Sequence, residues 1–169
     1  FRSSDNRQWA FIISGGSNTE RYYFTHISDT TKYKFHIKPE YFGDESNFTE
    51  IFPQRIERIL ERNADAKIFC VFDWDSIYKS KEEQIKYCDF VEQFKNEIAN
   101  GNVVICPSMP CIEYWFLLHF CDDKSLYKSY SKVSSPLAPH IKPCFPNPNV
   151  ALKKLLKQKL KEVRCRCRW

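Results

Sequence analysis

Four stretches of the chain have the hydrophobic pattern of β-strands. Residues 9–14, 66–72 and 103–106 are nearly unbroken apolar runs. Such runs are typical of the central strands of parallel sheets, because helices cover both faces of those strands. Residues 33–38 alternate apolar and polar side chains, which favours an edge strand. We therefore expect four strands, three of them buried on both sides.

Between the strands, apolar residues recur at the 3.6-residue spacing of amphipathic helices. This spacing predicts helices over 19–27, 48–62, 81–99 and 111–120, and the pair Asn100-Gly101 ends the third. We expect the third helix to direct inward Ile85, Cys88, Val91, Phe94 and Ile98. A last helix is expected from about Asn149, with an inward face made of Leu152, Leu155, Leu156, Leu160 and Val163.

The alternation of strands and helices predicts an α/β fold with a mainly parallel central sheet flanked by helices. We expect an α/β domain over 1–125, and over 126–169 a Pro-rich connector followed by a C-terminal basic helix. In parallel sheets, ligands bind beyond the carboxyl ends of the strands. Functional residues are therefore expected just after Ser14, Phe72 and Cys106.

The net charge of +5 is unevenly distributed along the chain. Residues 153–168 hold eight Lys or Arg and one acid, a charge of +7, which leaves −2 for the rest. A nucleic-acid-binding surface over the whole domain is therefore not indicated. The basic segment either binds phosphate or forms a solvated helix face, and both interpretations remain open.

The eight cysteines do not form a recognisable disulfide or zinc pattern, because no Cys-x-x-Cys occurs. The chain also lacks an apolar run near the roughly 20 residues of a membrane span. Residues 1–20 do not have the basic and then apolar segments of a signal peptide. We therefore expect reduced thiols, a cytoplasmic location and no membrane partner. Since the chain begins at Phe1, we expect that a few residues precede it.

The pair Asp73 and Asp75 is the sharpest local signal for chemistry. On an extended segment, residues i and i+2 point the same way, with Cα atoms roughly 6.5 Å apart. Two carboxylates so placed can bind one hard cation such as Mg²⁺ or Mn²⁺. A solvated loop with two acids is the alternative interpretation.

Two further acids lie in the first turns of predicted helices, Glu20 after the first strand and Glu113 after the last. Each is either a capping carboxylate favoured by the helix dipole or a member of the site. His119 lies six residues after Glu113, about 240° around the helix, so these two residues are not expected to form an acid–base pair. The loop 15–18 lacks the Lys of a P-loop, so a nucleotide site is not favoured.

Three motifs follow one another along the chain, at residues 12–24 (IISGGSNTERYYF), 69–75 (FCVFDWD) and 107–120 (PSMPCIEYWFLLHF). In this order they resemble the RloB-like family of bacterial and archaeal proteins, and the resemblance spans 9 to about 120. The resemblance implies a TOPRIM-like fold. It also implies a role in defence, because proteins of this family are found encoded beside restriction and abortive-infection genes. It also implies an Mg²⁺ site at Asp73 and Asp75, with Glu20 as the acid of the family's Gly-x-x-Thr-Glu pattern.

The chain departs from the family pattern at Gly15, where TOPRIM nucleases have their catalytic Glu, and at Met109, where the family usually has Asn. The family also continues beyond the final helix, so we expect the end at 164–169 to be truncated. Two hypotheses follow from the resemblance. The first is an Mg²⁺- or Mn²⁺-dependent nuclease in anti-phage defence, acting on RNA or DNA. The second is an inactive TOPRIM-like nucleic-acid-binding or regulatory module, partnered with an AAA- or ABC-type ATPase encoded alongside.

Under the nuclease hypothesis, the metal ligands are Glu20, Asp73 and Asp75, and the catalytic acids are Glu20 and Glu113. Since the basic charge gathers at the end of the chain, the expected nucleic-acid-binding residues are Lys153, Lys154, Lys157, Lys161 and Arg164. The sequence leaves the substrate, the activating trigger and the oligomeric state undetermined.

Overall fold

The computed structural model of the chain describes residues 9–15, 19–32, 35–38, 48–123 and 125–141. Its strands are β1 (Ala10–Ser14), β2 (His36–Lys38), β3 (Lys67–Asp73) and β4 (Val103–Ser108). Its helices are α1 (Thr19–Thr30), α2 (Phe48–Arg62), α3 (Trp74–Tyr78), α4 (Lys81–Gln93), α5 (Lys95–Ala99), α6 (Ile112–Leu118) and α7 (Tyr130–Ile141).

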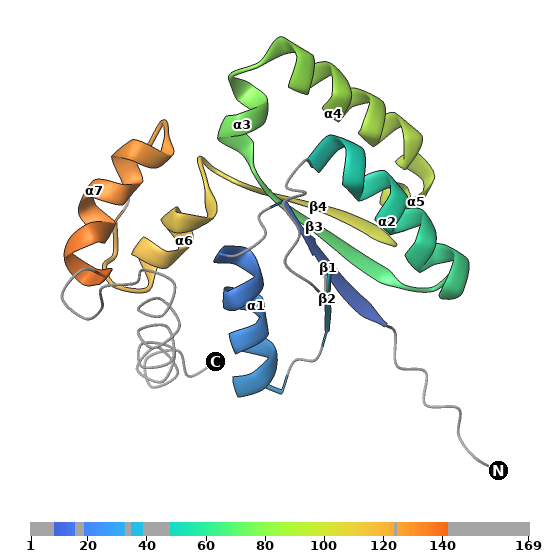
Figure 1. Cartoon of the computed structure of the whole chain (residues 1–169), viewed down its shortest axis with the longest axis horizontal. Helices are drawn as coiled ribbons and strands as arrows, with labels where there is room; N and C mark the ends of the chain where they lie inside the picture. The colour runs from blue at the N-terminus through green and yellow to red at the C-terminus, as the bar shows by residue number, and fades with distance from the viewer. Residues whose placement is uncertain (1–8, 16–18, 33–34, 39–47, 124, 142–169) are drawn as a thin grey trace.

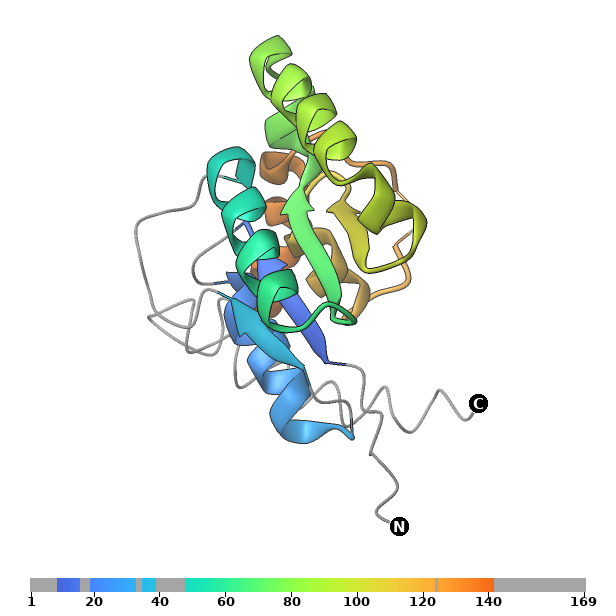
Figure 2. The same cartoon turned by 90° about the vertical axis from the view of Figure 1, so that its right-hand side faces the viewer.

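The four strands form one sheet in the order β2-β1-β3-β4, and every neighbouring pair is parallel. Helices α2, α4 and α5 lie over one face of the sheet, and α1 and α6 lie over the other (Figures 1 and 2). This arrangement confirms the α/β fold with a parallel sheet flanked by helices, and it is consistent with a TOPRIM-like fold. It also confirms the edge strand, since β2 pairs only with β1 among the described strands. The expectation that 103–106 is buried on both sides is wrong, because β4 lies at the other edge of the described sheet and only Val103 and Ser108 are buried in it.

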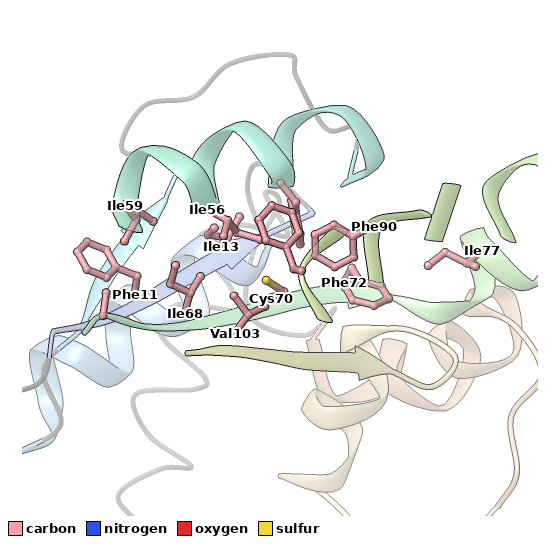
Figure 3. Packing of buried hydrophobic residues seen from close by; sticks show 13 residues of the cluster. Phe11, Ile13, Ile56, Ile59, Ile68, Cys70, Phe72, Ile77, Phe90 and Val103 are labelled. Atoms are coloured by element: carbon pink, nitrogen blue, oxygen red, sulfur yellow. The ribbon is translucent and has the colours of Figure 1, made fainter. Parts of the chain in front are cut away.

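Side chains of the central strands alternate between two hydrophobic clusters. The first cluster lies under α2 and α4 and includes Ile13, Ile68 and Phe72 (Figure 3). The second lies under α1 and α6 and includes Ile12 and Val71. Because both faces are buried, the strands need apolar residues at every position, which explains their unbroken apolar runs.

The predicted helix over 81–99 is wrong in two respects. It is two helices, since α4 ends at Gln93 and Phe94 adopts φ −106° and ψ 22° before α5 begins. Ile85 and Cys88, expected inside, are exposed, while Phe90 and Phe94 are buried. The first part of α4 extends past the carboxyl edge of the sheet (Figure 1), and α4 packs on the core through Tyr87 and Phe90 instead.

The segment expected to be a Pro-rich connector contains α7, which the sequence pattern did not predict. Leu137 of α7 is buried in the cluster that α6 forms with the sheet. Pro136 and Pro139 lie inside this helix, although each lacks the N–H of a helical hydrogen bond. Packing against α6 stabilises a helix that local propensity disfavours. The helix expected from Asn149 lies outside the described residues.

Candidate functional site at the carboxyl edge of the sheet

The carboxyl ends of β1, β3 and β4 lie side by side, because the strands are parallel and in close register. Ser14 pairs with Val71, and Asp73 pairs with Ser108. Helices α1 and α6 begin beyond the same edge, and their first turns carry Glu20 and Glu113. The topology thus brings together acids that lie far apart in the sequence.

Asp73 occupies the centre of this edge. It is the last residue of β3, and the backbone N–H of Ile112 donates to its Oδ1 at 2.8 Å. The pKa of Asp73 is raised to about 7: burial raises it most, the Ile112 hydrogen bond lowers it, and the charges of Glu20, Glu113 and Asp75 raise it again. A carboxylate under this pressure holds its proton near neutral pH unless a cation replaces it.

Glu20 is 5% exposed, in the first turn of α1. Burial raises the pKa of Glu20, its own backbone N–H lowers it, and the charge of Glu113 raises it again. Asp73, Glu20 and Glu113 therefore sense one another electrostatically, although they come from three different elements.

The geometry assumed for Asp75 is wrong. The chain is extended only as far as Asp73 and turns into α3 at Trp74, so Asp75 lies in the first turn of a helix. Its Oδ2 accepts a hydrogen bond from Lys79 Nζ at 2.7 Å, one turn further along α3. Asp75 still contributes negative charge near Asp73, but a metal at Asp75 would compete with this ion pair.

The donor chemistry of the edge suits Mg²⁺ or Mn²⁺, because carboxylate oxygens are the ligands that hard cations prefer. The raised pKa of Asp73 points to the same conclusion, since it reflects uncompensated negative charge in a partly buried place. Among the described residues, however, no three His, Cys, Asp or Glu side chains are grouped so as to hold a metal ion. The edge has the charge of a metal site without its assembled ligand set.

Gly15 follows directly after β1. Its φ is not positive, and its N–H continues the ladder by donating to the carbonyl of Val71 at 2.9 Å. A Cβ at this position would lie 3.4 Å from Cβ of Phe72, on the face covered by α2 and α4. Asp73 faces Ile112 on the opposite side. A Glu at position 15 would therefore start from the other face of the sheet instead of beside Asp73.

Sequence reasoning missed a link between the two helices that carry the acids. The hydroxyl of Tyr23 on α1 and Nε2 of His119 at the end of α6 are 3.3 Å apart. Burial lowers the pKa of His119, which favours the neutral ring. His119 thus has a partner other than Glu113. Local spacing could not reveal it, because the two residues are 96 positions apart.

The five predicted nucleic-acid-binding residues, which are Lys153, Lys154, Lys157, Lys161 and Arg164, lie outside the described residues. The described cysteines 70, 88, 106, 111 and 121 are free thiols. None of the described helices is both long enough and apolar enough to span a membrane.

Comparison with known proteins gives one informative result. The sequence model of a family described as RloB-like protein matches residues 10–166. That match covers the whole sheet, both helical layers and most of the segment beyond Ile141. Searches of curated proteins and of solved structures found no match.

Proposed function

The chain belongs to the RloB-like protein family, and on this premise we propose that it is an Mg²⁺- or Mn²⁺-dependent nuclease. It would cleave phosphodiester bonds of RNA or DNA in the bacterial cytoplasm as part of anti-phage defence. The observation that carries the proposal is the gathering of Asp73, Glu20 and Glu113 from three elements at one edge of the sheet, where burial and the neighbouring carboxylates raise the pKa of Asp73 to about 7. Such a cluster is favourable when a divalent cation neutralises it.

In this proposal, Glu20, Asp73 and Asp75 hold the metal. A metal held by these residues would supply charge neutralisation for the scissile phosphate and a more acidic bound water. The Ile112 N–H fixes the orientation of Asp73, and burial keeps Glu20 basic enough to accept a proton. Glu113 is the second candidate for proton transfer. The basic residues Lys153, Lys154, Lys157, Lys161 and Arg164 would bind the nucleic-acid backbone.

Two observations favour a second candidate function, an inactive nucleic-acid-binding or regulatory module partnered with an AAA- or ABC-type ATPase. Gly15 occupies the position of the family's catalytic Glu, and the described acids do not form a ready three-residue ligand group. Under this alternative, the acids at the edge of the sheet would keep its negative charge but would not catalyse cleavage.

Incubation of the purified protein with tRNA, plasmid or single-stranded DNA, in Mg²⁺, Mn²⁺ or EDTA, distinguishes the two. As a nuclease, the wild type cleaves one of these substrates only with metal. Asp73→Asn and Glu20→Gln then each lose at least about 10²-fold in rate, as is usual for acid–base and metal groups. The matched controls are Asp89→Asn on α4 and Glu61→Gln on α2, both exposed and away from the edge.

The binding module predicts no cleavage under any of these conditions. Cleavage that persists in EDTA and in both site variants would contradict the proposed site, because neither the metal nor the carboxylates would then be needed.

A further inference from the structure

A cavity of about 690 Å³ lies on the sheet face between α1 and α6, next to the acidic edge. Its walls are mostly carbon, from Tyr23, Phe24 and Ile27 of α1, Phe69 and Val71 of β3, and Trp115 of α6. Trp115 is 54% exposed. An open apolar surface of this extent is unfavourable in water and usually marks a contact site.

The chain itself contains a segment with a matching apolar face. At about 100° per residue in a helix, one side of 149–163 collects Leu152, Leu155, Leu156, Leu160 and Val163. Lys154, Lys157 and Lys161 lie on the opposite side, and Lys153 and the following Arg164 lie at its border. A helix with such a leucine face is stable only when that face is buried.

The segment begins close enough to reach the cavity. The described chain ends at Ile141, and the ring of His140 stacks on Phe120 at a centroid distance of 4.9 Å. Phe120 follows Trp115 by five residues, which is about 8 Å along a helix. The seven residues 142–148 span about 22 Å in a polyproline conformation, at 3.1 Å per residue. This length exceeds the distance of about 8 Å along the helix from Phe120 to Trp115.

Charge and family membership favour the same placement. Ser108 and Ile112 both line the cavity and adjoin Asp73, so the cavity opens beside the acidic edge. The segment 153–168 carries +7 against −2 for the rest of the chain. The family match continues to residue 166, so the segment belongs to the same family unit as the cavity.

We propose that residues 149–163 dock in cis, with their leucine face in the cavity between α1 and α6. Their basic face then points outward beside the acidic edge. This contact buries Trp115 and supplies a wall that the sheet and the two helices do not provide. The inference concerns the contact alone and stands whether or not the protein cleaves nucleic acid.

Photocrosslinking in the full-length chain tests this docking. A benzoylphenylalanine replacing Trp115 should crosslink mainly to peptides within 149–163, as mapped by mass spectrometry. The control places the same group at Ile85, which is 62% exposed on the far helical layer, and should give at least about tenfold fewer crosslinks to that segment. Mixing isotopically light and heavy chains shows whether the linked peptides belong to one molecule.

Matched variants identify the face that binds. Leu155→Asp with Leu156→Asp should reduce the Trp115 crosslinks at least about fivefold. Lys154→Asp with Lys157→Asp adds the same acids on the opposite face and should leave the crosslinks unchanged. If the leucine variant does not fold, Leu155→Ala with Leu156→Ala takes its place with the same expected direction. Crosslinks to mixed-isotope pairs, to other segments, or equally from Ile85 would overturn the proposal.

Discussion

At the residue scale, the protonation of Asp73 is the quantity that best reports on the candidate site. Its side chain faces the first turns of α1 and α6, whose acids repel its charge. In the unfolded chain the pKa of this carboxyl returns to the ordinary 3.8. The folded protein therefore binds this proton more tightly than the unfolded protein does.

Asp73→Asn should accordingly alter the pH dependence of stability in metal-free buffer. Well below pH 3.8 the carboxyl is protonated in both states and costs the wild type little. Between about pH 3.8 and 7 the unfolded state has released the proton while the folded state keeps it, so the wild type is progressively destabilised until the folded carboxyl also ionises above about 7. The Asn variant lacks this effect and should be more stable by about 1–2 kcal/mol near pH 8, after allowance for solvent screening.

Urea denaturation with EDTA at pH 4.5, 6 and 8 measures this difference, and Asp89→Asn is the exposed control. A difference between Asp73→Asn and the wild type that is the same at all three pH values would show that the pKa of Asp73 is not raised in the folded protein.

The two described glycines make a second residue-scale prediction. Gly15 has no positive φ, and an added Cβ meets only ordinary contacts. Gly101 has φ +76°, a conformation that other residues adopt at a cost. Gly15→Ala should therefore change the free energy of unfolding by less than about 1 kcal/mol, while Gly101→Ala should destabilise by about 1–2 kcal/mol. Thermal melts of both variants provide the comparison. If both variants are destabilised equally, position 15 requires glycine, contrary to this prediction.

At the element scale, local hydrophobic patterns predicted most of the strands and helices, because the type of an element depends on the spacing of its apolar residues. The apolar runs of β1, β3 and β4 are confirmed as strands, and the 3.6-residue period of α2 (Phe48–Arg62) is confirmed as a helix, because the apolar side chains of α2 pack on the sheet. Ile85 was misplaced because a period does not reveal where a helix runs past its sheet. Asp75 was misplaced because the strand turns into α3 directly after Asp73.

Local sequence patterns do not reveal contacts between distant segments, and this explains most of what was missed at the candidate site. The sequence placed Glu20, Asp73 and Glu113 at strand and helix ends correctly, since parallel topology alone brings those ends together. It could not supply the Ile112 N–H or the Tyr23–His119 link, because both join segments far apart in the chain. Whether these acids bind metal remains a prediction.

Helix α7 provides a prediction at this scale. Leu137 is 3% exposed and packs into the cluster formed by α6 and the sheet. Leu137→Ala should therefore cost about 2–4 kcal/mol through lost burial and the cavity left behind. Ser135→Ala, at an exposed position of the same helix, should change stability by less than about 0.5 kcal/mol. Urea titrations of both variants decide the matter. A loss at Leu137 no larger than at Ser135 would mean that α7 does not contribute to the core.

At the scale of the whole molecule, charge divides the chain into a mildly acidic body and a basic end. Binding of any nucleic acid releases counterions from each neutralised phosphate, so its salt dependence counts the contacts. The rest of the chain has a net charge of −2, so we do not expect it to supply most of the phosphate contacts. If 149–163 docks through its leucines, the lysines of its other face remain available.

Replacing Lys154, Lys157 and Lys161 with Gln should therefore flatten the salt dependence of binding without disturbing the leucine face. Each lost contact lowers the log–log slope by roughly 0.7 to 0.9, so the triple variant should lose about 2 to 3. Fluorescence anisotropy with labelled RNA and DNA in EDTA, between about 50 and 200 mM salt, measures the slope without cleavage. Replacing Lys81, Lys128 and Lys132, which are exposed on the body, by Gln removes the same charge and should leave the slope nearly unchanged. The reverse result, with a slope that depends on the body lysines, would place the phosphate contacts on the body and leave the basic end as a solvated helix face.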